Sequence, residues 1–301
     1  MWIRKHSDGL EIYAPAKLNL SLNILGKRPD GFHEIDTLVL PIDWYDLLYF
    51  RPLKSSRSLE LEIEQTVPSY AIEQRPRLSS RQDNLILKAL SLLRIRTGYT
   101  GGMSIRIVKS IPWAAGLAGG SSNAAASLFA GNLLWNLGLS QEELKSFGAE
   151  LGSDIPLFFQ SSATRCQGRG ELLEAVPQLS GLHFVVLSPR QGLSTADVFR
   201  SCQIREGMSD CSKLIQSLRT GDLRSAGQLM HNDLQEAAER LLPEMVRLRK
   251  QFDQYPVAGH QMSGSGTSYF ALCYGANQAR RIARQLHATH QGDVRWVRSF
   301  C

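Results

Sequence analysis

Residues 111–126 read Ile-Pro-Trp-Ala-Ala-Gly-Leu-Ala-Gly-Gly-Ser-Ser-Asn-Ala-Ala-Ala, and this is the most informative stretch of the chain. Nearly every residue after Trp113 is Gly, Ala or Ser, so backbone amides can approach a ligand without a side chain between them. The stretch follows a predicted strand at 103–108 and leads into a predicted helix at 122–137. Because a helix start offers unpaired N–H groups and the positive end of its dipole, the sequence predicts an anion site here.

Two common nucleotide motifs do not describe this loop. It lacks the lysine of the Gly-x-x-x-x-Gly-Lys-Ser/Thr phosphate loop, and it lacks the Gly-x-Gly-x-x-Gly order of dinucleotide-binding folds. Ser121 and Ser122 add hydroxyls that can bond a phosphate or a magnesium ion. An ordinary strand-to-helix turn, packed closely by small residues, is the other interpretation. The length of the small-residue run favours phosphate binding.

The part of the chain before residue 66 predicts strands. Leu18, Leu20, Leu22 and Ile24 recur at every second position, with polar residues between them. The same alternation returns at 59–65. A segment rich in Gly, Pro and Asp separates the first strand from the next, as in an antiparallel pair. We therefore expect an antiparallel sheet in this region.

Helices alternate with strands in the remainder. Asp83 is a candidate N-cap for a helix that reaches residue 96. Ser140 and Glu143 have the spacing of a capping box, which predicts a helix to about residue 151. The later elements are short strands within 164–188, helices to about 252, a strand within 262–274, a helix at 277–287 and a strand at 294–297. The overall pattern predicts an α+β fold with two lobes.

Composition narrows the class of protein. With 301 residues, of which 43% are hydrophobic and 21% charged, the chain can bury a full core. The net charge of +6 comes from scattered side chains without a dense Lys/Arg block, which suits an anionic metabolite as well as a nucleic acid. The five cysteines are widely spaced and form no metal-binding pattern, so reduced thiols are expected. No membrane span or signal peptide is apparent, which predicts a cytoplasmic protein with no membrane partner.

At residues 112–126 the loop resembles the central ATP motif of the GHMP kinases. Its Gly-Gly-Ser-Ser-Asn-Ala-Ala form is most similar to the members that phosphorylate 4-diphosphocytidyl-2-C-methyl-D-erythritol. Four further segments resemble motifs of those members, occur in the same order and extend the resemblance over residues 14–266. They read Ala14-Pro15-Ala16-Lys17-Leu18-Asn19-Leu20, Asp30-Gly31-Phe32-His33, Gly152-Ser153-Asp154-Ile155-Pro156 and Met262-Ser263-Gly264-Ser265-Gly266.

The resemblance implies a fold and an activity. The fold is a two-lobed α+β one, with an ATP-binding lobe similar to ribosomal protein S5 domain 2 at 1–163 and a ferredoxin-like lobe at 164–301. The activity is ATP-dependent phosphorylation of the 2-hydroxyl of 4-diphosphocytidyl-2-C-methyl-D-erythritol, in the non-mevalonate route to isoprenoid precursors. ATP is then the co-substrate, Mg²⁺ is expected with it, and no nucleic acid partner is expected.

The resemblance also implies roles for particular residues. Lys17 and Asp154 match the catalytic lysine and aspartate. The matching ATP-binding residues are Pro112, Trp113, Ala114, Ala115, Gly116, Leu117, Ala118, Gly119, Gly120, Ser121 and Ser122. The expected cytidyl-substrate residues are Asn19, Phe32, His33, Thr195 and Phe199, with Phe32 and Phe199 stacking on the base. Metal ligands are not singled out, although the two serines are the candidates.

Each of these residues also has an ordinary structural interpretation. Asp154 can serve as turn or capping chemistry, and Lys17 can be a solvated lysine at a strand edge. Phe199 fits the core face of an amphipathic helix, and His33 fits a surface turn. The resemblance instead implies that the Lys17 ammonium sits beside Asp154 and the reacting hydroxyl.

The chain departs from the family pattern at two places. Ala114, Ala115 and Ala118 stand where the family often has glycine, and alanine disfavours positive φ. Phe32 replaces a usual tyrosine, which keeps the ring face and removes the hydroxyl. Other functions remain open at this stage: a homoserine or mevalonate type of GHMP kinase, a nucleic-acid-binding S5-like protein, and a ligand sensor without catalysis.

Overall fold

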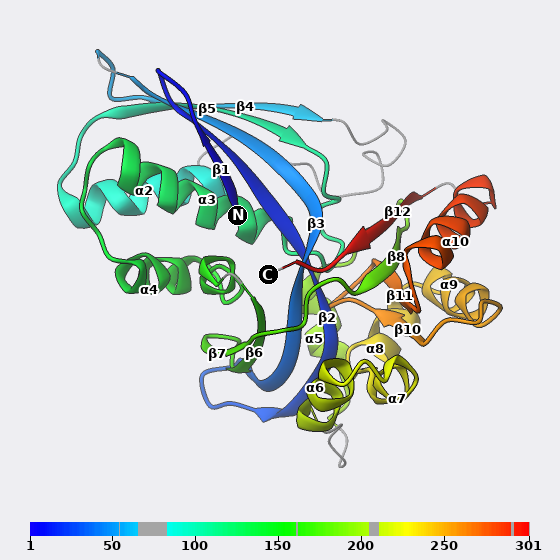
Figure 1. Cartoon of the computed structure of the whole chain (residues 1–301). Helices are drawn as coiled ribbons and strands as arrows, with labels where there is room; N and C mark the ends of the chain where they lie inside the picture. Colours follow the sequence, from blue (N-terminus) through cyan, green and yellow to red (C-terminus); the bar gives the residue numbers. More distant parts are fainter. Residues whose placement is uncertain (54, 66–82, 161, 205–210, 290–291, 301) are drawn as a thin grey trace.

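Two β-sheets with helices packed against them make up the computed structural model, which describes residues 1–53, 55–65, 83–160, 162–204, 211–289 and 292–300 (Figure 1). Within these residues, no helix has the length and apolarity needed to cross a bilayer. The two sheets correspond to the two lobes of the predicted α+β fold.

The first sheet has a core of five strands in the order β1-β2-β3-β5-β4. Their bounds are β1 (Trp2–Lys5), β2 (Leu10–Lys27), β3 (His33–Leu53), β4 (Leu59–Gln65) and β5 (Gly102–Lys109). Strands β1, β2 and β3 pair antiparallel as expected, but β4 pairs parallel to β5. The prediction of a wholly antiparallel start is therefore wrong for β4. A parallel pair needs a crossover connection, and helix α2 (Leu85–Thr97) lies in it.

Three helices accompany this sheet: α2, α3 (Gly119–Leu134) and α4 (Gln141–Leu151). The N-cap of α2 is Asn84, whose side chain accepts from the Ile86 amide at 3.0 Å, so the choice of Asp83 was wrong by one residue. The capping box of Ser140 and Glu143 is confirmed. Helix α3 starts three residues earlier than expected, because a left-handed residue at Ala118 turns the chain directly into it.

The second sheet is antiparallel, in the order β10-β11-β8-β12. Its strands are β8 (His183–Ser188), β10 (Gly259–Met262), β11 (Tyr269–Cys273) and β12 (Asp293–Arg298). Helices α9 (Glu244–Phe252) and α10 (Ala276–Thr289) pack on it and enclose a buried apolar cluster (Figure 1). Counted along the chain, the order 2-3-1-4 is that of the predicted ferredoxin-like lobe.

The remaining elements connect the lobes. Strands β6 (Ala163–Gly168) and β7 (Leu172–Val176) extend the first sheet from β3, and β9 (His231–Asn232) pairs parallel with β2. Between β8 and α9 the chain forms α5 (Thr195–Ser201), α6 (Cys211–Arg219), α7 (Leu223–Leu229) and α8 (Gln235–Leu241). A short 3-10 turn, η1 (Pro156–Phe159), follows α4. The division of the chain after residue 163 stays a prediction.

A buried carboxylate on β3 joins three elements of the first lobe. Asp46 is fully buried and accepts from the Lys109 ammonium at the end of β5. Its other donors are the backbone amides of Ser110 and Ile111, each at 2.8 Å, and the Asn123 side chain at 3.0 Å. Ser110 and Ile111 directly precede residues 112–122, which we call the small-residue loop, and Asn123 directly follows them. Asp46 thus holds both ends of the loop.

We predict that Asp46→Ala lowers the free energy of unfolding by about 3–5 kcal/mol, because the change leaves the buried Lys109 ammonium without its counter-charge. Chemical denaturation measures this loss. The exposed ion pair of Arg106 with Glu64, 3.4 Å apart on the same sheet, provides the control. Glu64→Ala should cost far less, since exposed pairs contribute little; equal losses in the two variants would contradict the role given to Asp46.

Candidate active site

The small-residue loop meets a second loop, residues 263–268, between the two sheets. The Gly116 carbonyl accepts from the Ser263 hydroxyl at 3.0 Å, and the Ala115 carbonyl accepts from the Ser268 amide at 3.0 Å. The Lys17 amide donates to the carbonyl of Leu117 at 3.1 Å, which joins the same loop to β2. A Cβ atom at Gly116 would lie 2.0 Å from the Ser263 carbonyl oxygen, so this contact requires glycine. The two loops therefore form one interlocked surface.

Within the small-residue loop, the backbone is left-handed at alternate residues. Ala114 has φ 52°, Gly116 φ 74° and Ala118 φ 52°. Left-handed residues in such turns direct backbone N–H groups toward a common concavity that suits an anion. Two of the three alanines that replace family glycines thus occupy positions that favour glycine, whereas Ala115 does not have a positive φ.

The start of α3 supplies the polar groups closest to this loop in sequence. Ser121 is partly exposed, and the buried hydroxyl of Ser122 has no hydrogen-bond partner. The side-chain oxygen of Asn123 is likewise buried without a partner. The Ser122 hydroxyl can donate to a phosphate or bind a phosphate-bound cation, whereas the Asn123 oxygen can only accept a hydrogen bond or bind a cation. Among the described residues, no group of three or more His, Cys, Asp or Glu side chains is placed to hold a metal ion by itself.

Lys17 and Asp154 face each other beside the loop. The Lys17 ammonium nitrogen lies 4.0 Å from an Asp154 carboxylate oxygen, although the residues come from β2 and from the turn after α4. The lysine side chain is only 6% exposed, whereas that of Asp154 is 51% exposed. Burial lowers the pKa of Lys17, and the Asp154 charge opposes that shift. A cation and a carboxylate of this kind, open to solvent on one side, can act on a ligand hydroxyl.

Asn19 continues the polar face of β2. Its side-chain oxygen accepts from the Lys17 ammonium, and its amide nitrogen donates to the Thr37 hydroxyl at 2.9 Å. A Cβ atom at Gly264 would lie 2.9 Å from the Lys17 nitrogen and 3.2 Å from the Asn19 oxygen. The second loop therefore covers both side chains, and the interpretation of Lys17 as a solvated edge lysine does not hold.

The residues expected to bind the cytidyl group lie in two subsets. The rings of His33 and Phe199 have centroids 5.3 Å apart and planes at 37°, while Thr195 shares a 2.9 Å hydrogen bond with the Ser265 hydroxyl. Phe32 is 50% exposed, and its ring contacts the Arg169 guanidinium. Phe199 therefore packs against the His33 ring, whereas Phe32 packs against the Arg169 guanidinium. Burial lowers the pKa of His33, which favours the neutral ring.

Residues that sequence reasoning did not select support this site from behind. The Asn232 side chain donates to the carbonyls of Met262 and Gly264, at 2.8 and 2.9 Å. Gln261 donates to the Asn19 carbonyl at 2.9 Å. For Gln261, the sequence signal that could have drawn attention to it is its place directly before the glycine motif at 262–266. Asn232 has no such signal, because it lies 30 residues before Met262.

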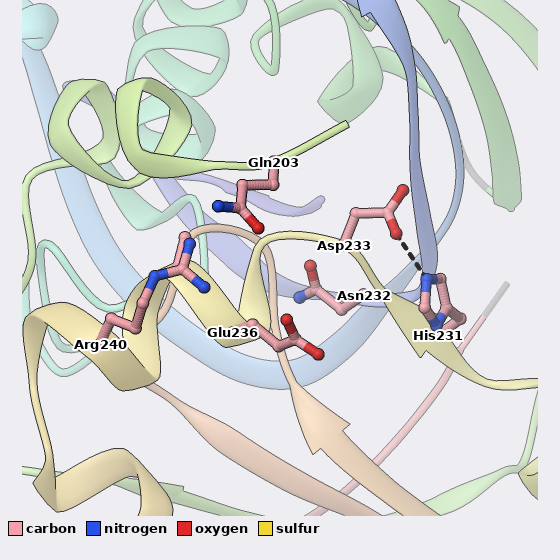
Figure 2. A pocket seen from close by; sticks show the side chains of 7 residues that line it. Gln203, His231, Asn232, Asp233, Glu236 and Arg240 are labelled. Atoms are coloured by element: carbon pink, nitrogen blue, oxygen red, sulfur yellow. Dashed lines mark hydrogen bonds and ion pairs between the residues drawn. The ribbon is translucent and has the colours of Figure 1, made fainter. Parts of the chain in front are cut away.

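Asn232 also borders a small cavity (Figure 2) of about 30 Å³. Its lining consists of Gln203, His231, Asn232, Asp233, Glu236, Ala237 and Arg240. Figure 2 shows His231 directed toward Asp233, with which it shares a hydrogen bond of 2.6 Å. A volume of this size holds a water molecule but no nucleotide. The cavity therefore cannot itself hold ATP or a cytidyl substrate.

Comparisons with known proteins identify relatives of this chain. Residues 84–161 match the family model of the GHMP kinases N terminal domain, and residues 214–291 match that of the GHMP kinases C terminal. A 4-diphosphocytidyl-2-C-methyl-D-erythritol kinase of Pelotomaculum thermopropionicum is 34% identical over 92% of this chain and 94% of its own. One of the same name from Shouchella clausii is 37% identical over 90% and 88%.

Solved structures give the same picture. A crystal structure of 4-(cytidine 5'-diphospho)-2C-methyl-D-erythritol kinase is 29% identical, with a TM-score of 0.78, and the alignment covers 97% of this chain and 100% of the other. Homoserine kinase from Cytophaga hutchinsonii is 16% identical over 99% and 96%, with a TM-score of 0.75. The homoserine kinase shows the shared fold alone.

We predict that Ala118→Gly raises the free energy of unfolding by about 1 kcal/mol, because glycine adopts φ 52° without the penalty of a Cβ atom. Denaturant unfolding measures this gain. Ala115→Gly is the matched control in the same loop. It removes a buried methyl group where φ is not positive, so it should lower stability by about 1 kcal/mol. The same sign for both variants would contradict the strain at Ala118.

Proposed function

Because the chain belongs to the GHMP kinases, we propose that it transfers the γ-phosphoryl group of ATP to the 2-hydroxyl of 4-diphosphocytidyl-2-C-methyl-D-erythritol. This reaction belongs to the non-mevalonate synthesis of isoprenoid precursors, which we place in the cytoplasm. The single observation that carries the proposal is the approach of Lys17 to Asp154, 4.0 Å apart, beside a loop suited to phosphate. Relatives more than 30% identical over about nine tenths of the chain supply the choice of alcohol.

The donor site is formed by the small-residue loop and the start of α3. Backbone amides of residues 113–120 and the Ser121 hydroxyl are suited to the β- and γ-phosphates of ATP. The unpaired hydroxyl of Ser122 fits a magnesium ion that accompanies the nucleotide. When bound, this ion would neutralise charge on the transferring phosphate. Loop side chains are small, so the phosphates can approach the backbone.

At the acceptor side, Asp154 is the general base. It takes the proton of the 2-hydroxyl as the hydroxyl oxygen forms a bond to the γ-phosphorus of ATP, while the bond from that phosphorus to the bridging oxygen breaks and ADP leaves. Lys17 stabilises the negative charge that develops on the acceptor oxygen and the phosphoryl group. Burial lowers the pKa of Lys17, and the Asp154 charge opposes this shift in favour of the ammonium form.

The cytidyl end of the substrate has candidate partners on both lobes. His33, neutral because burial lowers its pKa, offers one donor and one acceptor to the edge of the base. Phe32 and Phe199 offer ring faces for stacking. Asn19 accepts from Lys17 of the catalytic pair, and Thr195 shares a hydrogen bond with Ser265 of the second loop.

The other functions considered explain less of this geometry. A nucleic-acid-binding protein or a sensor without catalysis has no need for a buried lysine that faces a carboxylate. Homoserine and mevalonate kinases share the fold, but the solved structures of these enzymes are 13–18% identical to this chain. Homoserine and mevalonate also lack an aromatic base for the rings of Phe32 and Phe199.

The purified protein is expected to form ADP from ATP and Mg²⁺ only when 4-diphosphocytidyl-2-C-methyl-D-erythritol is present. A coupled assay for ADP, with homoserine and mevalonate as alternative acceptors, measures this dependence. Mass spectrometry of the product should show one added phosphoryl group. Turnover with homoserine or mevalonate but not with the cytidyl alcohol would reject the proposed substrate.

Asp154→Asn should lower kcat by about 100- to 10,000-fold, because the amide cannot accept the hydroxyl proton. Affinity for ATP and for the cytidyl alcohol should change little, which calorimetry can follow. Asp253→Asn is the matched control, since Asp253 has a similarly exposed side chain, 53% against 51%. The assignment of Asp154 as the base fails if its variant turns over as fast as the control.

A further inference from the structure

A positively charged side chain lies beside the proposed substrate site and has no role in the function described so far. Arg169 occupies the tip of the hairpin formed by β6 and β7, between Gly168 at φ 72° and Gly170 at φ 113°. The last residue of β6, Gly168, pairs with Ile35 near the start of β3. The hairpin tip therefore lies next to the turn that carries Phe32 and His33.

The hairpin is held firmly to β3. Arg165 of β6 forms two hydrogen bonds of 2.8 Å to the carboxylate of the buried Asp36. On its other side the tip approaches the catalytic turn, since a Cβ atom at Gly170 would lie 3.7 Å from the Cβ atom of Ser153. Ser153 directly precedes Asp154. The tip is thus placed between the turn with Phe32 and the turn with the proposed base.

The Arg169 guanidinium retains donors for a ligand. Its central carbon lies 4.9 Å from the centre of the Phe32 ring, and its side chain is 32% exposed. Its ion pair with Glu171 is 3.8 Å long and so exceeds hydrogen-bond length. Among the residues that the structure describes, no side-chain or carbonyl acceptor forms a hydrogen bond with this guanidinium.

The acidic residues of the neighbouring turn are engaged elsewhere. Arg28 forms ion pairs with both Asp30 and Glu34. Asp30 also accepts from the Phe32 amide at 3.1 Å. Arg28 is thus the ion-pair partner of both carboxylates, and the Arg169 guanidinium, whose charge also acts on Asp30, is directed at the Phe32 ring.

The connectivity of the substrate decides what such a cation would meet. In a cytidine diphosphate alcohol, the diphosphate joins the nucleoside to the alcohol that reacts. If the base lies at Phe32 and His33 and the reacting hydroxyl lies at Lys17 and Asp154, the diphosphate must pass between them. Arg169 comes from the hairpin tip that contacts both regions. Its planar fork of N–H donors matches phosphate oxygens.

We propose that Arg169 binds the diphosphate of the cytidyl substrate, an inference that rests on the function proposed above. The guanidinium stacks on the Phe32 ring and donates to phosphate oxygens at its edge. It thereby makes the enzyme selective for cytidine compounds that carry a diphosphate over those that do not.

The test compares CDP with cytidine as ligands of the full-length protein, with the ATP site saturated by a non-hydrolysable ATP analogue. Wild-type protein should bind CDP more tightly than cytidine. Arg169→Met keeps an unbranched apolar side chain beside Phe32 and removes the charge. It should weaken the binding of CDP about 10- to 100-fold, as the loss of a charged hydrogen bond does, and change the affinity for cytidine by about twofold or less. The affinity of Arg169→Lys for CDP should lie between that of the wild type and that of Arg169→Met.

Arg106→Met is the matched control, because Arg106 also stacks on a ring, that of Tyr49 at 4.4 Å, and also pairs with a glutamate. It should bind both ligands as the wild type does. Equal weakening of CDP and cytidine by Arg169→Met would mean that Arg169 only orders Phe32, and unchanged CDP affinity would mean that it contacts no phosphate; either result overturns the inference. Turnover of the full substrate by the wild type separates these outcomes from a failure of the proposed function.

Discussion

The buried carboxylate of Asp46 is the interaction on which the donor side of the molecule depends. A charge inside a protein is costly unless it is paired and hydrogen-bonded. Asp46 meets this condition with the Lys109 ammonium and with donors from both flanks of the small-residue loop. The loop itself has few side chains with which to pack or hydrogen-bond. Its ends must therefore be held from outside, and β3 does so through one side chain.

The closed arrangement of the two lobes is the second requirement. Lys17 is buried because the loop at 263–268, from the second lobe, lies over β2 and against Gly116. Without that cover the ammonium would be solvated, and its attraction to Asp154 would be much weaker. The first lobe thus contributes the two side chains proposed to be catalytic, and the second contributes the cover that buries the Lys17 ammonium.

Several features of the site are unfavourable for stability alone. Ala114 and Ala118 adopt left-handed backbone conformations, Lys17 is buried, and the Ser122 hydroxyl has no partner. Strained residues and unpaired polar groups persist where the surrounding structure imposes them, and they gather at functional sites. Here they gather at the small-residue loop, the start of α3 and the proposed catalytic pair. A phosphate would accept hydrogen bonds from the loop amides, and its cation would satisfy the unpaired oxygen.

The sequence by itself determined the local features, because these depend on residue type and spacing. The alternation of Leu18, Leu20, Leu22 and Ile24 predicted a buried strand face, and all four are buried. The capping box and the ordered motifs were equally readable, and the motifs placed the chain among the GHMP kinases. The polar residues between those four apolar ones are buried as well, because the second lobe covers Asn19 and its polar neighbours, and periodicity alone does not indicate this.

Only the tertiary structure decided how distant segments meet. Lys17 and Asp154 are 137 residues apart in the chain, yet the β2 strand and the turn after α4 bring their charged groups within 4.0 Å. Arg169 reaches Phe32 because β6 pairs with β3, and β4 lies parallel to β5 because of the α2 crossover. Such contacts depend on sheet register and lobe packing. They join residues with no shared spacing in the sequence, so no local pattern could have predicted them.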